Sequence, residues 1–267
     1  MRVKILVPTV ALIALLAFPT VAFAATWDLA TDYAARGDGT SPPSAKDSAN
    51  RTTWYFKYSS PGNATNPASY AANELAWVNG YSWMPDATGI KGWTRSSTWT
   101  HISVNTGPPA NSNTTPGFMW QSGWVLGHPM PYSDSQPFVV VEWRSPVAGS
   151  ADVSALVADI DSGGGDGVEY WLLKNSTVLS QSTVGNGTSA TPSVNNVAVV
   201  AGDSIYLVLG PGTAGDHGWD TTRLNLTVTV PDPPVVSTPA SSGWTLALLG
   251  VLGLAGVARR RHLSTSA

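Results

Sequence analysis

Three aspartates crowd one glycine-rich turn and indicate a site that could hold a cation. Asp159, Asp161 and Asp166 surround the run Gly163-Gly164-Gly165. Carboxylates this close repel one another unless a cation or a set of amide donors neutralises them. Ca²⁺ fits best, because it accepts about six to eight oxygen ligands in flexible geometry, although the spacing is not that of an EF-hand. We expect a structural Ca²⁺ at these residues, or else a solvated turn whose aspartates accept local backbone hydrogen bonds.

Two further aspartates, Asp216 and Asp220, could join this group from a neighbouring loop.

Tryptophan is unusually frequent, with twelve in the chain. Trp143 and Trp171 lie in strand-like runs, where core or sheet-face packing is expected. Others lie near Gly, Pro, Ser and Asn, where a ring can stay partly exposed and stack on the C–H face of a sugar. We expect five of these to bind a polysaccharide, or alternatively to cover the end of the fold beneath long loops. The five are Trp83, Trp93, Trp99, Trp120 and Trp124.

The residues available for catalysis are few. The chain has no Gly-x-Ser-x-Gly elbow, no His-Glu-x-x-His zinc motif and no phosphate-binding loop. A glycosidase needs two carboxylates across a cleft, and the candidates Glu142 and Glu169 lie in separate strand-like runs. His128 precedes a proline and suits a turn, while His217 suits a loop better than a metal site. We predict no catalytic residue and interpret the chain as a non-enzyme.

The body that must position these side chains has the pattern of an all-β fold. In its last part, Leu224, Leu226, Val228 and Val230 alternate with polar residues, as in a strand with one buried face. Six runs rich in β-branched and aromatic residues are separated by turn-forming residues, which predicts an antiparallel β-sandwich or jelly roll. These runs are 138–143, 152–158, 168–173, 195–200, 204–209 and 221–230.

The first half of the body, 26–132, is expected to complete the same sandwich. Strands are predicted at 52–58, 76–83 and 98–104.

In the second half of the body, hairpin turns are predicted at 174–176 and 201–203, because Asn and Gly tolerate positive φ.

Both ends of the chain carry apolar segments with flanking charges. Residues 1–24 show the basic, apolar and small-residue order of a secretory signal peptide. Near the other end an apolar helix is predicted at 244–258. It is shorter than the roughly 20 residues that a transmembrane helix usually needs, but it could cross a thin membrane. The three arginines that follow should stay cytoplasmic, which places the body outside. We therefore expect a body at 25–230, a Pro/Ser-rich linker at 231–243 and a basic tail at 259–267.

The balance of charge excludes some partners. Residues 25–236 contain nine Lys and Arg but all seventeen Asp and Glu of the chain, which argues against nucleic acid and anionic membrane surfaces as partners. There are no cysteines, so neither disulfides nor thiolate metal sites stabilise the fold.

The C-terminal region resembles the PEP-CTERM class of bacterial sorting signals. The resemblance rests on a Pro-bearing spacer, the run Trp244-Thr245-Leu246-Ala247-Leu248-Leu249-Gly250-Val251-Leu252-Gly253-Leu254 and the three arginines. It implies recognition by a sorting protease or transpeptidase of the exosortase type, contact with the membrane through the C-terminal helix, and delivery to the envelope exterior. Thr238-Pro239-Ala240 stands where the class has Pro-Glu-Pro, and a rhombosortase-type tail or a plain single-span anchor shares the layout.

The stretch 120–230 resembles the exported jelly-roll domains that precede such tails in environmental bacteria. This resemblance implies a binding or structural accessory role. It is carried by Leu126-Gly127-His128-Pro129, Val139-Val140-Val141-Glu142-Trp143-Arg144-Ser145-Pro146, Gly163-Gly164-Gly165-Asp166-Gly167-Val168, Ala201-Gly202-Asp203-Ser204-Ile205 and Asp220-Thr221-Thr222.

Taken together, these patterns predict an exported, envelope-associated and non-catalytic β-sandwich that binds extracellular polysaccharide or forms matrix. The alternatives are a secreted polysaccharide hydrolase or lyase with paired carboxylates, and a purely structural surface protein.

Overall fold

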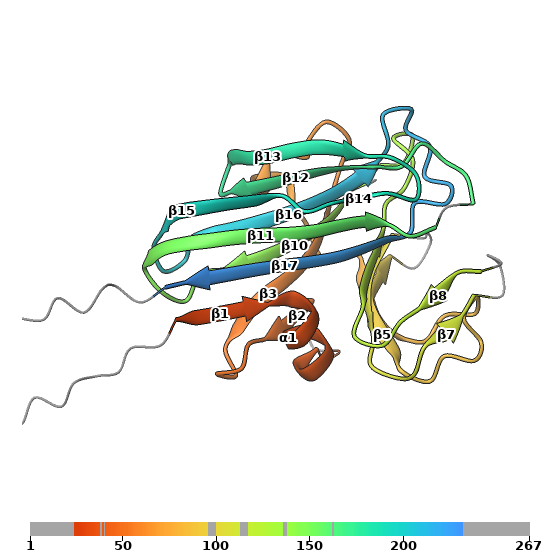
Figure 1. The fold of residues 1–267 in the computed structure, drawn as a ribbon, viewed down its shortest axis with the longest axis horizontal. Coiled ribbons are helices and arrows are strands. Elements are labelled where there is room, and N and C mark those ends of the chain that lie inside the picture. Colours follow the sequence, from red (N-terminus) through yellow and green to blue (C-terminus); the bar gives the residue numbers. More distant parts are fainter. Residues whose placement is uncertain are drawn as a thin grey trace, which may run out of the picture. The chain divides into compact units, whose positions relative to one another are not determined.

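The computed structural model describes residues 24–37, 39, 41–95, 100–112, 117–135, 138–161 and 163–231. They form an antiparallel β-sandwich with one short α-helix, which confirms the predicted fold class (Figure 1). The predicted signal peptide and the regions after Pro231, including the helix at 244–258, lie outside the described residues. In the described part of the chain, no helix is long and apolar enough to cross a bilayer.

The larger sheet has nine strands in the described residues. They are β1 (Ala25–Asp28), β4 (Leu75–Asn79), β5 (Ile90–Arg95), β6 (His101–Asn105), β9 (Val125–His128), β11 (Gly149–Asp159), β14 (Ser189–Ala190), β15 (Ser193–Val199) and β17 (Thr222–Val230). Its main order is β14-β11-β17-β9-β6-β5-β4, while β1 also pairs with β17 and β15 with β11. Figure 1 shows β11 and β17 side by side along the sandwich, where they pair over eight residues.

The smaller sheet has six strands in the order β13-β12-β16-β10-β3-β2. They are β2 (Ser44–Lys46), β3 (Thr52–Ser59), β10 (Phe138–Arg144), β12 (Val168–Lys174), β13 (Thr177–Val184) and β16 (Ser204–Pro211). Two short strands, β7 (Ala110–Asn111) and β8 (Met119–Trp120), form a separate pair, and a 3₁₀ turn spans Pro67–Ser69.

The main core lies between the two large sheets and follows from strand alternation. On β17 the apolar residues from Leu224 to Val230 are buried and their polar neighbours are half-buried, as the sequence predicts. On β10, Val139, Val141 and Trp143 face this core. The intervening Phe138 and Val140 face a second cluster, on the outer side of the smaller sheet. Apolar side chains therefore cover both faces of the smaller sheet along β10. On the outer face this cover does not reach the edge strand β13.

All six strands predicted in the second half are present, with small differences at their ends. The turn at Asn175 (φ 49°) joins β12 to β13 as a hairpin, as predicted. The turn at Gly202 (φ 94°) is different, because β15 belongs to the larger sheet and β16 to the smaller one. This second turn carries the chain across the sandwich, so the prediction of a hairpin there is wrong.

The first half contains elements that the sequence pattern did not indicate. Strand β5 and helix α1 (Leu29–Arg36) were not predicted, and the strand predicted at 76–83 ends at Asn79. Helix α1 begins after Asp28, whose carboxylate accepts a hydrogen bond from the Thr31 N–H at 2.9 Å. The helix is too short to show a helical repeat and is stabilised by packing of Leu29 and Tyr33 in the main core.

Candidate functional site

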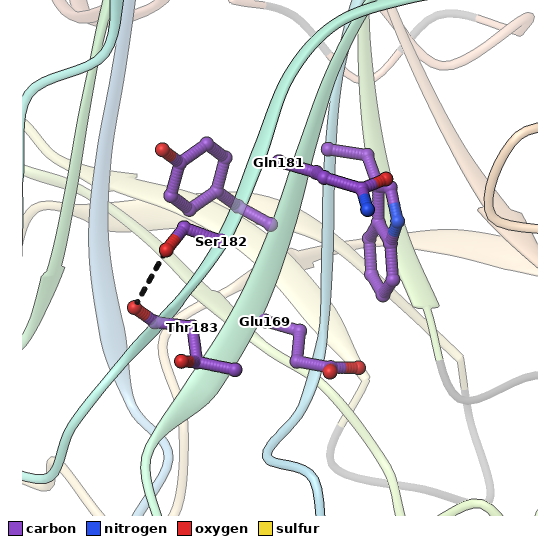
Figure 2. A pocket seen from close by; sticks show the side chains of 6 residues that line it. Glu169, Gln181, Ser182 and Thr183 are labelled. Atoms are coloured by element: carbon purple, nitrogen blue, oxygen red, sulfur yellow. Dashed lines mark hydrogen bonds between the residues drawn. The ribbon is translucent and has the colours of Figure 1, made fainter.

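A surface pocket of about 310 Å³ lies on the hairpin formed by β12 and β13. It is lined by residues from both strands, namely Glu169, Tyr170, Trp171, Gln181, Ser182 and Thr183. The register places Trp171 opposite Gln181 and Glu169 opposite Thr183, so these four side chains share one face of the pair. Figure 2 shows Glu169 and Gln181 projecting to one side of the hairpin and Ser182 lying on the other.

The sequence of β12 explains why polar and aromatic groups meet here. Val168, Tyr170 and Leu172 point into the main core, which sends Glu169 and Trp171 to the outer face. Trp171 packs against the second cluster, with its ring centroid 5.5 Å from that of Phe138. The ring is only half-buried, because the cover of this sheet stops at its edge.

A glycine on the neighbouring strand lets these rings lie flat on the sheet. Gly210 of β16 pairs with Glu169, and a Cβ atom there would lie 2.7 Å from the Phe138 ring and 3.2 Å from the Trp171 ring. A side chain at 210 would therefore displace the aromatic floor of the pocket.

Tyr132 holds the carboxylate at the pocket. Its hydroxyl donates a hydrogen bond to Oε2 of Glu169. Burial, together with the hydrogen bond to Glu169 and the charges of Glu169 and Asp166, holds the pKa of Tyr132 above its ordinary value. The phenol therefore stays protonated and fixes the orientation of Glu169.

The pocket has the chemistry of a site for an uncharged, polyhydroxylated ligand. The Trp171 ring offers an apolar face, while the carboxylate of Glu169 accepts hydrogen bonds and the amide of Gln181 both donates and accepts them. A few placed polar groups around an aromatic surface are typical of small-molecule sites.

The two glutamates considered as a catalytic pair do not converge. Glu142 lies on β10, opposite Tyr206 of β16, which pairs in turn with Leu173 of β12. Glu169 is thus two strands across and four residues along from Glu142, or roughly 16 Å away. Glycosidase carboxylates lie about 5–10 Å apart, so this pair cannot act together.

Glu142 is instead the centre of a buried ion-pair network. Its carboxylate lies 2.6 Å from the Lys57 Nζ and 3.0 Å from the Arg144 guanidinium, and it accepts a hydrogen bond from Ser204 at 2.7 Å. Burial opposes ionisation of Glu142, but the hydrogen bonds from Lys57 and Ser204 and the two positive charges outweigh it and lower the pKa. The residue has a structural role.

The expectation of exposed loop tryptophans is wrong for three of the five. Trp83 and Trp120 stack with Tyr81 in a third cluster beneath the loops, their ring centroids 6.1 Å apart, and Trp93 packs edge-on against Trp77 at 5.3 Å. The exposed fractions are 9%, 0% and 4% for Trp83, Trp120 and Trp93. Large rings gain more by packing on one another than by facing water. Trp83 and Trp120 therefore have the covering role weighed as the alternative, whereas Trp93 lies in the main core.

The structure does not decide the role of the other two tryptophans. Trp124 is half-buried, and the Arg223 guanidinium carbon lies 4.4 Å from the centroid of its ring. Trp99 lies outside the described residues. Binding of a sugar by Trp99 and Trp124 stays a prediction.

The rings of His101, His128 and His217 lie in a row. His128 lies 6.0 Å from His101 and 6.1 Å from His217, measured between ring centroids. Burial, with the charges of His101 and His217, lowers the pKa of His128 to about 3, so its ring stays neutral near pH 7. His128 is the last residue of β9 and pairs with His101 of β6, so the interpretation of His128 as a turn residue is wrong.

The predicted aspartates do gather at one end of the sandwich. Asp159 and Asp161 are buried and linked, since the Asp161 N–H donates to Oδ1 of Asp159 at 3.2 Å. Asp166 accepts a hydrogen bond from the Ala214 N–H at 2.6 Å. These local bonds match the solvated-turn alternative in part. Among the described residues, no three His, Asp or Glu side chains are grouped closely enough to hold a metal ion as they stand.

Strand alternation explains the burial of the acidic residues. The inward series of β11, from Ala151 to Val157, continues to Asp159. The Ile160 N–H donates to the Thr221 carbonyl at 3.0 Å, so the pairing with β17 extends one residue further. Continuing this register places Asp161 opposite Asp220, which is fully buried.

Burial and mutual repulsion raise the pKa of two of these carboxyl groups. Burial raises the pKa of Asp220 to about 8, with the charges of Asp159, Asp166, Asp216 and Asp161 adding to it. Burial and the charge of Asp161 raise the pKa of Asp159 to about 7.

Comparisons with known proteins give only distant likenesses. No family model matches the chain, and no curated protein matches it. A solved structure of CBM51 from Clostridium perfringens GH95, in complex with methyl-galactose, is 11% identical with a TM-score of 0.32, over 58% of this chain and 92% of that one. A native family 35 carbohydrate-binding module from Clostridium thermocellum is 13% identical with a TM-score of 0.26, over 47% and 88%.

A third similar structure is the Podospora anserina GH26-CBM35 β-(1,4)-mannanase. It is 14% identical with a TM-score of 0.28, over 50% of this chain and 27% of the mannanase. Likenesses at these TM-scores do not indicate what the chain binds.

Proposed function

We propose that this chain is a non-catalytic β-sandwich that binds a sugar unit of an extracellular polysaccharide in the pocket on β12 and β13. The observation that carries the proposal is the half-buried ring of Trp171 beside Glu169, Gln181 and Thr183. The ring would stack on the C–H face of a sugar, and the polar groups would bond its hydroxyls.

Two features support binding without turnover. Tyr132 holds Glu169 by a hydrogen bond, and Glu142 is engaged in ion pairs far from the pocket. A polysaccharide hydrolase or lyase would need a second carboxylate facing Glu169 across the ligand. Neither Glu142 nor a lining residue other than Glu169 supplies one. A matrix role would use the same pocket to attach polymer.

Removing the Trp171 ring tests the proposal. We expect Trp171→Ala to weaken glycan binding by at least about tenfold, because a stacking aromatic at the centre of a site carries much of the binding free energy. Affinity gel electrophoresis across neutral and acidic polysaccharides would identify the ligand, and isothermal titration calorimetry would measure the loss.

A matched control is Tyr55→Ala, which removes a ring from the same sheet but outside the pocket. Tyr55 lies on β3 opposite Glu142, with the Arg144 guanidinium carbon 4.2 Å from its ring centroid. Its removal should leave glycan affinity unchanged. Absence of retention by every polysaccharide, or equal losses for the two variants, would refute a sugar site at Trp171.

We further propose that the chain is exported and processed at its C-terminal region by an exosortase-type enzyme, with the body retained at the cell envelope. The support is the order of segments in the sequence at 1–24 and 231–267. Mass spectrometry of envelope-extracted protein should give a chain that begins at Ala25 and lacks residues 259–267. An intact chain recovered from the cytosol would contradict export.

A further inference from the structure

Three connecting segments meet at the end of the sandwich where β11 ends and β17 begins. A Cβ atom on Gly163 would lie 2.4 Å from the Trp219 ring, and one on Gly165 would lie 2.4 Å from the Gly218 carbonyl oxygen. The Asn186 side-chain amide donates to the Gly164 carbonyl. The segments β11–β12, β13–β14 and β16–β17 are therefore in direct contact, and only glycine leaves room for the approach.

One carboxylate in this contact region lacks any partner. Asp220 is 0% exposed, and both of its carboxylate oxygens are without a hydrogen bond. A Cβ atom on Gly165 would lie 3.2 Å from Oδ1 of Asp220, so the carboxylate points toward the segment that bears the predicted aspartates. A buried carboxylate left unsatisfied carries a large desolvation penalty.

Other buried side-chain oxygens near Asp220 also lack a hydrogen-bond partner. Oδ2 of Asp159, Oδ1 of Asp161, Oδ1 of Asp166 and the amide oxygen of Asn186 are buried and have no hydrogen-bond partner. None of the ion pairs in the described part of the chain involves these aspartates. The region has an excess of oxygen acceptors and lacks a positive charge.

We propose that Asp220, together with Asp159, Asp161 and Asp166, binds a divalent cation of the Ca²⁺ type. Such an ion accepts carboxylate, amide and carbonyl oxygens in variable geometry, which suits ligands from several loops. The side chains must draw together around it, since they do not stand in a ligating arrangement without it. The cation site does not depend on sugar binding.

Thermal unfolding of the full chain tests the site. After removal of divalent ions with EDTA, we expect CaCl₂ at one hundred times its Kd to raise Tm by about 5–10 °C. NaCl of equal ionic strength should not reproduce this shift. Equilibrium dialysis should give one Ca²⁺ per chain. No shift beyond that in NaCl would overturn the proposal.

The decisive variant is Asp220→Asn, which keeps the shape of the side chain and removes its charge. Without Ca²⁺ the variant should be at least as stable as the wild type, because it relieves repulsion between buried carboxylates. The rise in Tm with Ca²⁺ should be lost. Asp86→Asn, at an exposed position, should keep the full rise.

A second variant guards against failure of the first to fold. Asp161→Asn should also reduce the response to Ca²⁺ and the measured stoichiometry. If either folded variant keeps the wild-type response, these aspartates do not bind the ion.

Discussion

Replacement of Trp143 by alanine should lower the free energy of unfolding by about 4 kcal/mol, as for other fully buried Trp-to-Ala changes. Trp143 is 0% exposed on β10, between the two large sheets, and its ring centroid lies 5.1 Å from that of Trp27. The change would remove ring contacts and leave a cavity that strands fixed by pairing on both sides cannot close. Urea denaturation followed by circular dichroism would measure the loss.

The control for this substitution is Val200→Ala. Val200 is 59% exposed, so its truncation should cost less than about 1 kcal/mol. A similar loss for both variants would mean that the described packing around Trp143 is incorrect.

The second large effect concerns the buried carboxylate on β10. We expect Glu142→Gln to lower the free energy of unfolding by about 2–3 kcal/mol, somewhat less than for a fully enclosed ion pair, since Lys57 and Arg144 are partly exposed and can reach water. Urea denaturation at pH 7 would measure this. The control is Glu74→Gln, because Glu74 pairs with Arg95 at 3.0 Å but is 47% exposed, and should lose under about 1 kcal/mol.

The effect of Glu142→Gln should depend on pH in a defined direction. The pKa of Glu142 is lower in the folded state than its ordinary value, so its ionisation stabilises the fold above the unfolded-state pKa. This contribution is lost as the pH falls through the folded-state pKa. The difference between wild type and variant should therefore shrink in acid, and a difference that grows on acidification would contradict the assigned ion pairs.

Much of the fold could be predicted from local patterns. The alternation in β17 indicates both the strand and its buried face, and the turn at Asn175 marks a hairpin. Such signals work because the period of a strand is fixed by its backbone. The turn at Gly202 has the same local chemistry as a hairpin, and only the pairing of β15 and β16 with different sheets reveals the crossover.

The candidate site was harder to predict, because exposure is a property of tertiary packing. Trp83, Trp93 and Trp120 stand beside turn-forming residues, yet the third cluster buries Trp83 and Trp120, and the main core buries Trp93. Trp171 lies in a strand but near the uncovered edge of its sheet. The alternation of Val168, Tyr170 and Leu172 with Glu169 and Trp171 was the available signal that an aromatic and a carboxylate share an outer face.

The proposed cation site could be predicted from the sequence only in part. Clustering of Asp159, Asp161 and Asp166 is visible in the sequence, whereas the role of Asp220 needs the pairing of β11 with β17. Long-range strand register decides which distant carboxylate lies opposite the turn, and no local pattern encodes it.

The first described strand, β1, pairs with the last, β17, at one end of the sandwich. Ala25 lies opposite Val230, so β1 begins where β17 ends. The pocket lies near the start of β12, at the end of the sandwich where the predicted aspartates lie. Strand β17 begins at this same end and runs to Val230 at the opposite end. Within the body, the pocket therefore lies toward the end of the sandwich opposite to Ala25 and Val230, so changes at that terminal strand pair leave the pocket residues untouched.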